Sequence, residues 1–163
     1  MAFIRGFFVL LGLLVPGAAL AQADGPFGPS TVSWSVQPAA AKPGAPLKLT
    51  LNGTVAQGWH VYGLKQLPGG PTPLLVTLET NGVASAEGTA AGSPAKTVHD
   101  PAFDLDTQFY ADAFTLTVPV RLKPQLPAGP QQVPVSVRFQ TCNGRICQPP
   151  HTVHLSATVN LQG

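Results

Sequence analysis

Two cysteines, Cys142 and Cys147, lie close together in the segment FQTCNGRICQPPH and are the only cysteines of this 163-residue chain. An Asn-Gly pair lies between them, and this pair favours a tight hairpin turn because both residue types tolerate positive φ. A strand predicted at 133–139 would run into this turn and bring the cysteines face to face. Cross-strand neighbours lie about 4.5–5.5 Å apart, which is within reach of a disulfide. The sequence therefore predicts a bridged pair at the tip of a β-ribbon.

Such a bridge has two interpretations, structural and redox-active. A disulfide that closes a loop of about six residues stabilises a fold by only about 2 kcal/mol, much less than a bridge between distant strands. The next residues, Pro149 and Pro150, interrupt a backbone ladder, as expected at a sheet edge or end. A local bridge in an exposed turn is of the type that tends to be reducible. The spacing alone leaves both interpretations open.

Metal binding is a third interpretation of the same segment. Cys142, Cys147, His151 and His154 have the spacing C-x4-C-x3-H-x2-H, which resembles a zinc or copper ligand set. In a strand, however, two histidines three residues apart point to opposite faces. At most three of the four ligands would converge, so we expect neither a metal ion nor another cofactor.

The N-terminal residues 1–21 have the pattern of a secretory signal peptide. Arg5 is followed by an apolar run that ends in small residues before Ala21. This run is interrupted by glycine and proline, and it is shorter than the roughly 20 apolar residues that a membrane span requires. We expect cleavage after Ala21 or Ala23, a flexible leader at 22–30, and a periplasmic protein without stable membrane insertion. Disulfides form and persist in that compartment.

The bulk composition indicates one folded domain. Hydrophobic residues make up 44% of the chain and charged residues 10%, which is unlike a disordered segment. Without Arg5 the chain has eight Lys and Arg against seven Asp and Glu. A balanced charge gives no electrostatic basis for binding nucleic acid, which normally needs a clustered basic face. We also expect a monomer.

Apolar residues at every second position predict strands along most of the chain. Turn signals rich in proline and glycine separate the runs, and no window has convincing helical periodicity. The prediction is an all-β fold, an immunoglobulin-like antiparallel β-sandwich of two sheets over residues 31–163. The predicted strands are 32–36, 47–51, 74–78, 114–120, 133–139 and 153–159, with shorter ones at 59–62 and 83–87.

Residues 97–114 break this alternation. The segment contains four of the five aspartates and four aromatic side chains. Irregular connections of this length in compact domains are usually functional. We therefore expect a non-alternating loop whose aromatic residues need a place to bury.

The cysteine segment FQTCNGRICQPPHTVHL resembles the active-site hairpin of the N-terminal periplasmic domain of DsbD, the thiol:disulfide interchange protein. Further similarities follow in the same order along residues 32–159: GWHVYG, PGGPTPLLVTL and HDPAFDLDTQFYADAFTLTVPV. The resemblance implies an immunoglobulin-like fold whose cysteines alternate between dithiol and disulfide. It also implies a protein-disulfide reductase activity, with a membrane-embedded thiol reductase as electron donor and periplasmic thioredoxin-like proteins as acceptors. The chain ends at Gly163, so both partners are expected to be separate proteins.

The resemblance also implies roles for individual residues. Cys147 is expected to react with the partner and Cys142 to resolve the mixed disulfide. The cap segment is longer than in the family, so either Phe103 or Phe109 is the expected lid. Because side chains alternate along a strand, His60 and Tyr62 are expected nearer the cysteines than Trp59. The full expected surround is Trp59, His60, Tyr62, Asp100, Phe103, Phe109 and Tyr110.

The thiolate that exchange requires needs local stabilisation, because a free cysteine has a pKa of about 8.5. Arg145 and His151 are expected to favour the charged form. Asp100 would oppose it, or would instead take a proton from one thiol as the other reacts. Two functions besides exchange stay open at this point: a binding module with a structural disulfide, and a metal carrier.

Overall fold

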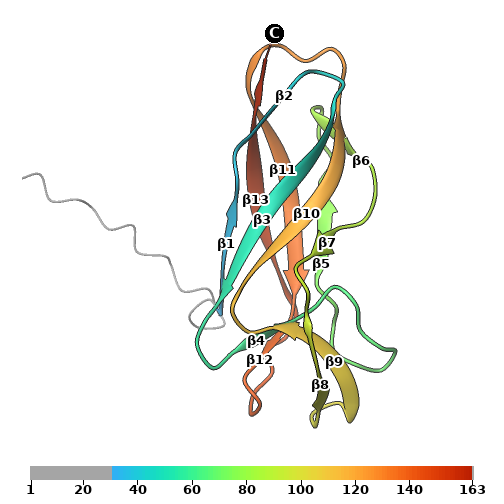
Figure 1. Cartoon of the computed structure of the whole chain (residues 1–163), viewed down its shortest axis with the longest axis vertical. Coiled ribbons are helices and arrows are strands. Elements are labelled where there is room, and N and C mark those ends of the chain that lie inside the picture. Colours follow the sequence, from blue (N-terminus) through green and yellow to red (C-terminus); the bar gives the residue numbers. More distant parts are fainter. Residues whose placement is uncertain (1–30, 163) are drawn as a thin grey trace, which may run out of the picture.

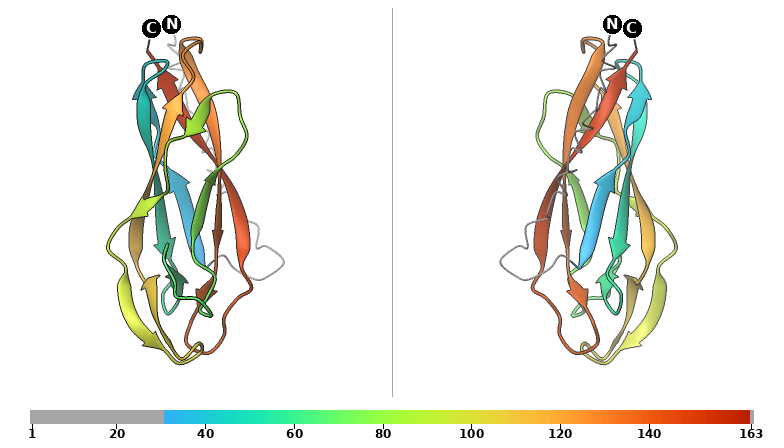
Figure 2. Two further views of the ribbon diagram at one scale, coloured as in Figure 1. Left: turned by 90° about the vertical axis from the view of Figure 1, so that its right-hand side faces the viewer. Right: turned by 90° about the vertical axis from the view of Figure 1, so that its left-hand side faces the viewer.

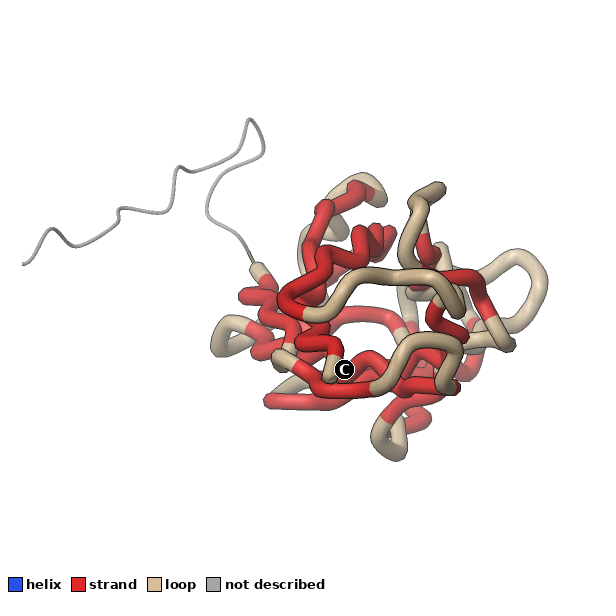
Figure 3. Tube along the Cα trace, turned by 90° about the horizontal axis from the view of Figure 1, so that it is seen from above, coloured by secondary structure: helices blue, strands red, loops and turns tan. Residues whose placement is uncertain are grey.

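The structure, a computed structural model, describes residues 31–162, which form an elongated β-sandwich with a smaller third sheet at one end (Figure 1). The expected signal peptide at 1–21 and the leader at 22–30 lie outside the described residues. Within the described part no helix is present (Figure 3). The strands are β1 (Val32–Val36), β2 (Ala39–Ala41), β3 (Pro46–Val55), β4 (His60–Tyr62), β5 (Leu75–Leu78), β6 (Ala84–Ala86), β7 (Ala91–Gly92), β8 (Lys96–Asp100), β9 (Leu105–Tyr110), β10 (Ala113–Leu122), β11 (Gly129–Phe139), β12 (Thr141–Cys142) and β13 (His151–Leu161).

Two sheets make the sandwich and face each other along its length (Figure 2). The first has the order β1-β3-β10-β6, with β7 also paired to β10, and the second has the order β2-β13-β11-β5. All of these pairs are antiparallel except β2 with β13, which is parallel. The predicted all-β, immunoglobulin-like sandwich is confirmed, and the short strands predicted at 59–62 and 83–87 are present as β4 and β6.

The core is built from the alternating apolar positions. Along β10, and along β11 from Val133 onward, every second side chain is buried, and the side chains between them are more exposed. Complete burial of one such aliphatic side chain stabilises the fold by about 1.5–3 kcal/mol. These two strands, one from each sheet, contribute Phe114, Leu116, Val118, Val120, Val133, Val135, Val137 and Phe139 to the core.

The third sheet was not expected. Its order is β12-β4-β9-β8, and it lies at the end of the molecule opposite the C-terminus (Figures 1 and 2). Residues 97–114 are therefore not an irregular loop, as the sequence suggested, but a hairpin of β8 and β9 followed by the start of β10. β8 is exposed along most of its length, and Val98 is 50% exposed. A strand with no face against the core shows no alternation of apolar and polar residues. The sequence pattern therefore did not reveal β8.

Candidate redox site

The third sheet has two faces with different roles. Its registers place Cys142 opposite His60, Tyr62 opposite Phe109 and Val98 opposite Thr107. Directly opposed residues project from the same face of a sheet, and so do residues two apart along a strand. One face therefore carries Cys142, His60, Tyr62, Phe109, Thr107, Val98 and Asp100. The other carries Thr141, Val61 and Tyr110, which are buried, and the latter two belong to the hydrophobic core.

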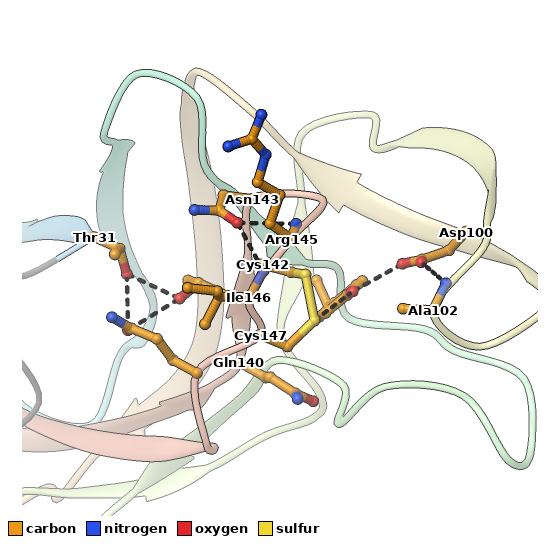
Figure 4. Close-up of a disulfide and its surroundings, with 12 residues drawn as sticks. Thr31, Asp100, Ala102, Gln140, Cys142, Asn143, Arg145, Ile146 and Cys147 are labelled. Carbon is orange, nitrogen blue, oxygen red and sulfur yellow. Dashed lines mark hydrogen bonds between the residues drawn. A yellow bond between two sulfur atoms is a disulfide. The ribbon is translucent and has the colours of Figure 1, made fainter.

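Cys142 and Cys147 form a disulfide, with their Cα atoms 4.1 Å apart (Figure 4). The turn between them depends on Asn143, whose Oδ1 accepts hydrogen bonds from the backbone N–H groups of Arg145 (3.0 Å) and Ile146 (2.9 Å). Gly144 has φ +79°, whereas Asn143 is not among the residues with positive φ. The expected tight turn is present, but asparagine acts as a side-chain acceptor and only glycine adopts the left-handed conformation.

The two sulfur-bearing residues differ in exposure. Cys142 is only 2% exposed, whereas Cys147 is partly exposed. Cys142 is held in place by β12, where its neighbour Thr141 is fully buried and its Oγ1 lies 2.9 Å from Oγ1 of Thr31. Gln148, which follows the second cysteine, donates its backbone N–H to the carbonyl of Thr141 (2.9 Å). An incoming sulfur therefore has better access to Cys147.

Tyr62 connects the disulfide to a carboxylate. Its hydroxyl lies 3.9 Å from Sγ of Cys147 and donates a hydrogen bond of 2.8 Å to Oδ2 of Asp100 (Figure 4 shows both as dashed lines). Burial raises the pKa of Tyr62 well above its usual value, and the hydrogen bond and negative charge of Asp100 raise it further. Tyr62 therefore keeps its proton at neutral pH.

A turn between β8 and β9 positions both Asp100 and Phe103. Oδ1 of Asp100 accepts a hydrogen bond from the N–H of Ala102 (2.9 Å), and its carbonyl accepts one from Phe103 (3.2 Å). Asp104 closes the turn at φ +52°, a conformation that aspartate adopts more readily than most residues. The Phe103 ring then meets the Tyr62 ring edge-to-face, with centroids 5.9 Å apart.

His60 occupies the other side of the same face. Its ring lies 5.1 Å from the ring of Tyr62 and 4.8 Å from that of Phe109. Its Nε2 atom is buried and has no hydrogen-bond partner. Burial lowers the pKa of His60, although the negative charge of Asp100 partly offsets this effect. His60 is therefore a neutral imidazole at neutral pH.

Two residues of the expected surround lie elsewhere. Tyr110 stacks on Phe114, with centroids 4.3 Å apart, and donates a hydrogen bond to the carbonyl of Ser93 (3.1 Å). Trp59 packs against the hydrophobic core. Tyr110 follows Phe109 directly in β9, so strand alternation turns it toward the sandwich and away from the disulfide. The same alternation places His60 and Tyr62 on the disulfide side, as expected.

A cleft of about 430 Å³ opens on the disulfide side of the third sheet. It is lined by Cys142, His60, Thr107 and Phe109, and by the segment 98–102. Sequence reasoning missed Thr107 and Val98 as site residues. The signal that could have found them is their even spacing from Phe109 and Asp100 along the two strands, but it has meaning only once the strands are paired.

The cationic residues expected to favour a thiolate are not directed at the sulfurs. Arg145 extends away from the disulfide (Figure 4). His151 packs on Phe139, with ring centroids 4.2 Å apart. The other proposed metal ligand, His154, pairs through Nδ1 with Glu79. Among residues 31–162, no group of three or more His, Cys, Asp and Glu is arranged to hold a metal ion.

Fold and site together define an immunoglobulin-like domain with a Cys-x4-Cys disulfide at one end, and the comparisons assign it to a family. Residues 32–158 match the family of the thiol:disulfide interchange protein DsbD, N-terminal, so the chain belongs to this family and is a thiol–disulfide exchange domain. Domains of this family are periplasmic and interact with thioredoxin-like partners in general. No helix in the described residues is long and apolar enough to cross a membrane.

Other comparisons add only a general likeness. No match was found among curated proteins. Among solved structures, AggA, the major subunit of aggregative adherence fimbriae type I from Escherichia coli, is 13% identical with a TM-score of 0.35, over 79% of this chain and 94% of that one. BcpA, the major pilin subunit of Bacillus cereus, is 8% identical with a TM-score of 0.35, over 80% and 40% of the two chains.

Proposed function

We propose that this domain relays electrons from a membrane-embedded thiol reductase to periplasmic thioredoxin-like proteins, after export directed by residues 1–21. The observation that carries the proposal is the asymmetry of the disulfide: Cys147 is partly exposed and lies beside a hydroxyl–carboxylate pair, while Cys142 is buried. A purely structural bridge has no need for one accessible sulfur next to proton-handling groups.

The accepting half-reaction begins when a thiolate of the donor attacks Sγ of Cys147. A mixed disulfide forms, the Cys142–Cys147 bond breaks, and Cys142 leaves with the electron pair and takes up a proton. The second thiol of the donor then loses its proton and attacks its own sulfur in the mixed disulfide, so Cys147 is released as a thiolate and takes up a proton. In sum, the donor dithiol becomes a disulfide, and this domain becomes a dithiol with two electrons and two protons more.

The donating half-reaction runs in the opposite sense. The Cys147 thiolate attacks the disulfide of the thioredoxin-like acceptor, one acceptor sulfur leaves as a thiolate, and a mixed disulfide forms. Cys142 then attacks Cys147 in that mixed disulfide, which restores the intramolecular bridge and frees the second acceptor sulfur. The resolving cysteine needs no exposure to solvent, because the sulfur that it attacks is its bonded neighbour.

The Tyr62–Asp100 pair provides a route for the proton of Cys147. The Tyr62 hydroxyl already donates its hydrogen to Asp100, so its oxygen is free to accept a hydrogen bond from the reduced Cys147 thiol. A proton moves from Cys147 to the tyrosine oxygen as the tyrosine hydrogen moves to the carboxylate. Because its pKa is raised, Tyr62 passes the proton on and does not store a negative charge.

Phe103 is the proposed lid. It lies in the turn between β8 and β9 and covers Tyr62 by an edge-to-face contact, whereas Phe109 is part of β9 itself and packs on His60. A turn residue can move aside when a partner docks without loss of strand pairing. This difference favours Phe103 over Phe109.

The test is to trap the mixed disulfide. A Cys142→Ser variant with Cys147 free is expected to accumulate a covalent complex with an oxidised thioredoxin-like protein, visible on non-reducing gels and released by dithiothreitol. The Cys147→Ser variant is the matched control, and it should trap much less because Cys142 is buried. Equal trapping by both variants would contradict the assigned roles. Absence of any complex would contradict the proposed function.

A further inference from the structure

The cleft beside the disulfide contains two buried polar atoms that bond to nothing in the described structure. Oγ1 of Thr107 and Nε2 of His60 both lack a hydrogen-bond partner, and both residues line the cleft. Thr107 is only 2% exposed, so its hydroxyl has little access to bulk water. A buried hydroxyl without a partner destabilises the folded state, because it has lost its hydrogen bonds to water and gained none. Both atoms are covered by their surroundings but belong to residues of the cleft wall, so a ligand that docks into the cleft and opens its wall would supply their partners.

Besides His99 and Asp100, the rest of the lining is largely apolar. The position of the cleft is tied to the exchange reaction. Val98, Ala102 and Phe109 line it, together with Cys142, the sulfur residue that leaves when Cys147 is attacked. The Cα atoms of the two cysteines are 4.1 Å apart. Consecutive residues of a chain have Cα atoms about 3.8 Å apart. A partner cysteine bonded to Cys147 therefore brings its sequence neighbours to the mouth of the cleft.

Two of the exposed large apolar side chains in the described residues flank this region. Val98, 50% exposed, lines the cleft, and Ile146, 63% exposed, lies in the turn between the cysteines. The carboxylate of Asp100 is already engaged by Tyr62 and Ala102. His99, which also lines the cleft, lies against the carboxylates of Asp104 (3.3 Å) and Asp106 (3.6 Å). Both of these lining residues are thus engaged within the domain, and the surface suits an uncharged peptide segment. The volume of the cleft, about 430 Å³, lies within the range of sites that hold small ligands.

We infer that this cleft is a specificity pocket for the thioredoxin-like partner, which accepts the apolar side chain next to the partner's reactive cysteine. The adjoining peptide group of the partner pairs with the Thr107 hydroxyl and with His60 Nε2. This inference rests on the proposed function, because it assumes that a partner sulfur reaches Cys147. It adds a recognition rule, namely that the residue beside the reactive cysteine is apolar.

The test uses short peptide thiols and the oxidised wild-type protein. Peptides of the form acetyl-Ala-X-Cys-Ala-amide and acetyl-Ala-Cys-X-Ala-amide, with X as Leu or Ser, differ in no charge. The rate of mixed-disulfide formation is measured by mass spectrometry after acid quenching. In at least one of the two positions the Leu peptide is expected to react roughly tenfold faster than the Ser peptide, because a hydrophobic pocket discriminates by about this factor.

Substitutions in the cleft then assign the preference to its residues. Thr107→Val keeps the side-chain shape and removes the hydroxyl, and Val98→Ser removes apolar lining from an exposed position. Each is expected to lower the Leu-over-Ser ratio roughly threefold. Thr97→Val is the matched control, since Thr97 is the neighbouring residue of β8 and projects from the opposite face of the same sheet. It should keep the wild-type ratio.

Thermal unfolding of Thr107→Val adds an independent readout. If the hydroxyl is held unpaired for a ligand, its removal raises the melting temperature of the oxidised protein while it lowers the peptide preference. A lower melting temperature would show a structural hydroxyl and would overturn the inference. So would a wild-type Leu-over-Ser ratio near one, or a ratio unchanged in both cleft variants. Failure of every peptide to react would instead overturn the proposed function itself, and this inference with it.

Discussion

At the residue scale, Asp100 joins the geometry of the site to its chemistry. One carboxylate oxygen holds the turn through Ala102, and the other holds the hydroxyl of Tyr62 beside Cys147. The carboxylate therefore has two separable duties. An amide at this position keeps an oxygen for the turn but is a far weaker proton acceptor.

We predict that Tyr62→Phe and Asp100→Asn each slow exchange with a protein disulfide by about 10- to 100-fold, at the low end of general acid–base effects. The two changes interrupt one proton route, so the double variant should be little slower than the slower single variant. Stopped-flow tryptophan fluorescence measures the rates. Asp112→Asn is the control, because Asp112 is exposed and pairs with Lys96. Additive effects of the two substitutions would argue against a shared route.

His60 makes the stability of the fold depend on pH. Its pKa is lowered in the folded state by burial, so below about pH 6.5, the usual value for histidine, the unfolded chain binds a proton more readily than the folded one. The contribution is therefore complete above that pH and is lost as the pH falls toward the lowered pKa.

The expected outcome is a decrease in the free energy of unfolding between pH 6.5 and 5 that is smaller in a His60→Phe variant. The slope contributed by one proton is at most about 1.4 kcal/mol per pH unit. Urea unfolding of the oxidised protein at a series of pH values measures it. Identical pH profiles for the two proteins would show that His60 does not carry the effect.

At the scale of elements, the two faces of the third sheet make different contacts. Val61 and Tyr110 attach it to the sandwich core, and the opposite face presents the disulfide site. Strands β4, β9 and β12 are short and come from distant parts of the chain. Residues on the disulfide face of this sheet can therefore change without a change in the strand pairing of the sandwich. The β8–β9 turn, with Phe103, lies outside the paired strands of this sheet.

Phe103→Ala is predicted to raise the rate at which dithiothreitol reduces the disulfide by roughly threefold or more, because the proposed lid, which packs on Tyr62 beside Cys147, is removed. A Phe109→Leu variant serves as the comparison, since it keeps an apolar side chain on β9. If Phe109→Leu accelerates reduction more than Phe103→Ala, the lid is Phe109. Rates are followed by thiol labelling at timed intervals.

At the scale of the whole molecule, stability and redox chemistry are located in different places. The core lies between the two sheets of the sandwich, whereas the disulfide bridges residues only five apart in sequence at one end. The bridge therefore contributes little to the folded state. We therefore expect the domain to lose and regain it without unfolding.

Reduction of the disulfide is expected to preserve the far-ultraviolet circular dichroism spectrum and to lower the free energy of unfolding by about 2 kcal/mol. Leu116→Ala, which truncates a fully buried side chain, should cost about 2–5 kcal/mol. Urea unfolding of both proteins, with and without dithiothreitol, makes the comparison. Unfolding on reduction alone would mark the bridge as structural.

The sequence by itself determined the long strands of the sandwich and the disulfide pair, but not the short strands β2 and β7. Alternating burial follows from apolar residues such as Leu49, Leu51 and Val118, because the residues with which they alternate are their direct neighbours in the sequence. The cysteine pair and its Asn-Gly turn are equally local. For both features the interactions that decide the structure fall within a few residues, so spacing alone reveals them.

Only the tertiary structure decided how the site is assembled. Tyr62 and Asp100 are 38 residues apart, and Tyr62 and Cys147 are 85 apart, so no local pattern joins them. Strand pairing in the third sheet turned Tyr110 inward and brought Thr107 into the cleft. The unequal burial of the two sulfurs depends on which chain segments pack around each one, and that is a property of the folded molecule.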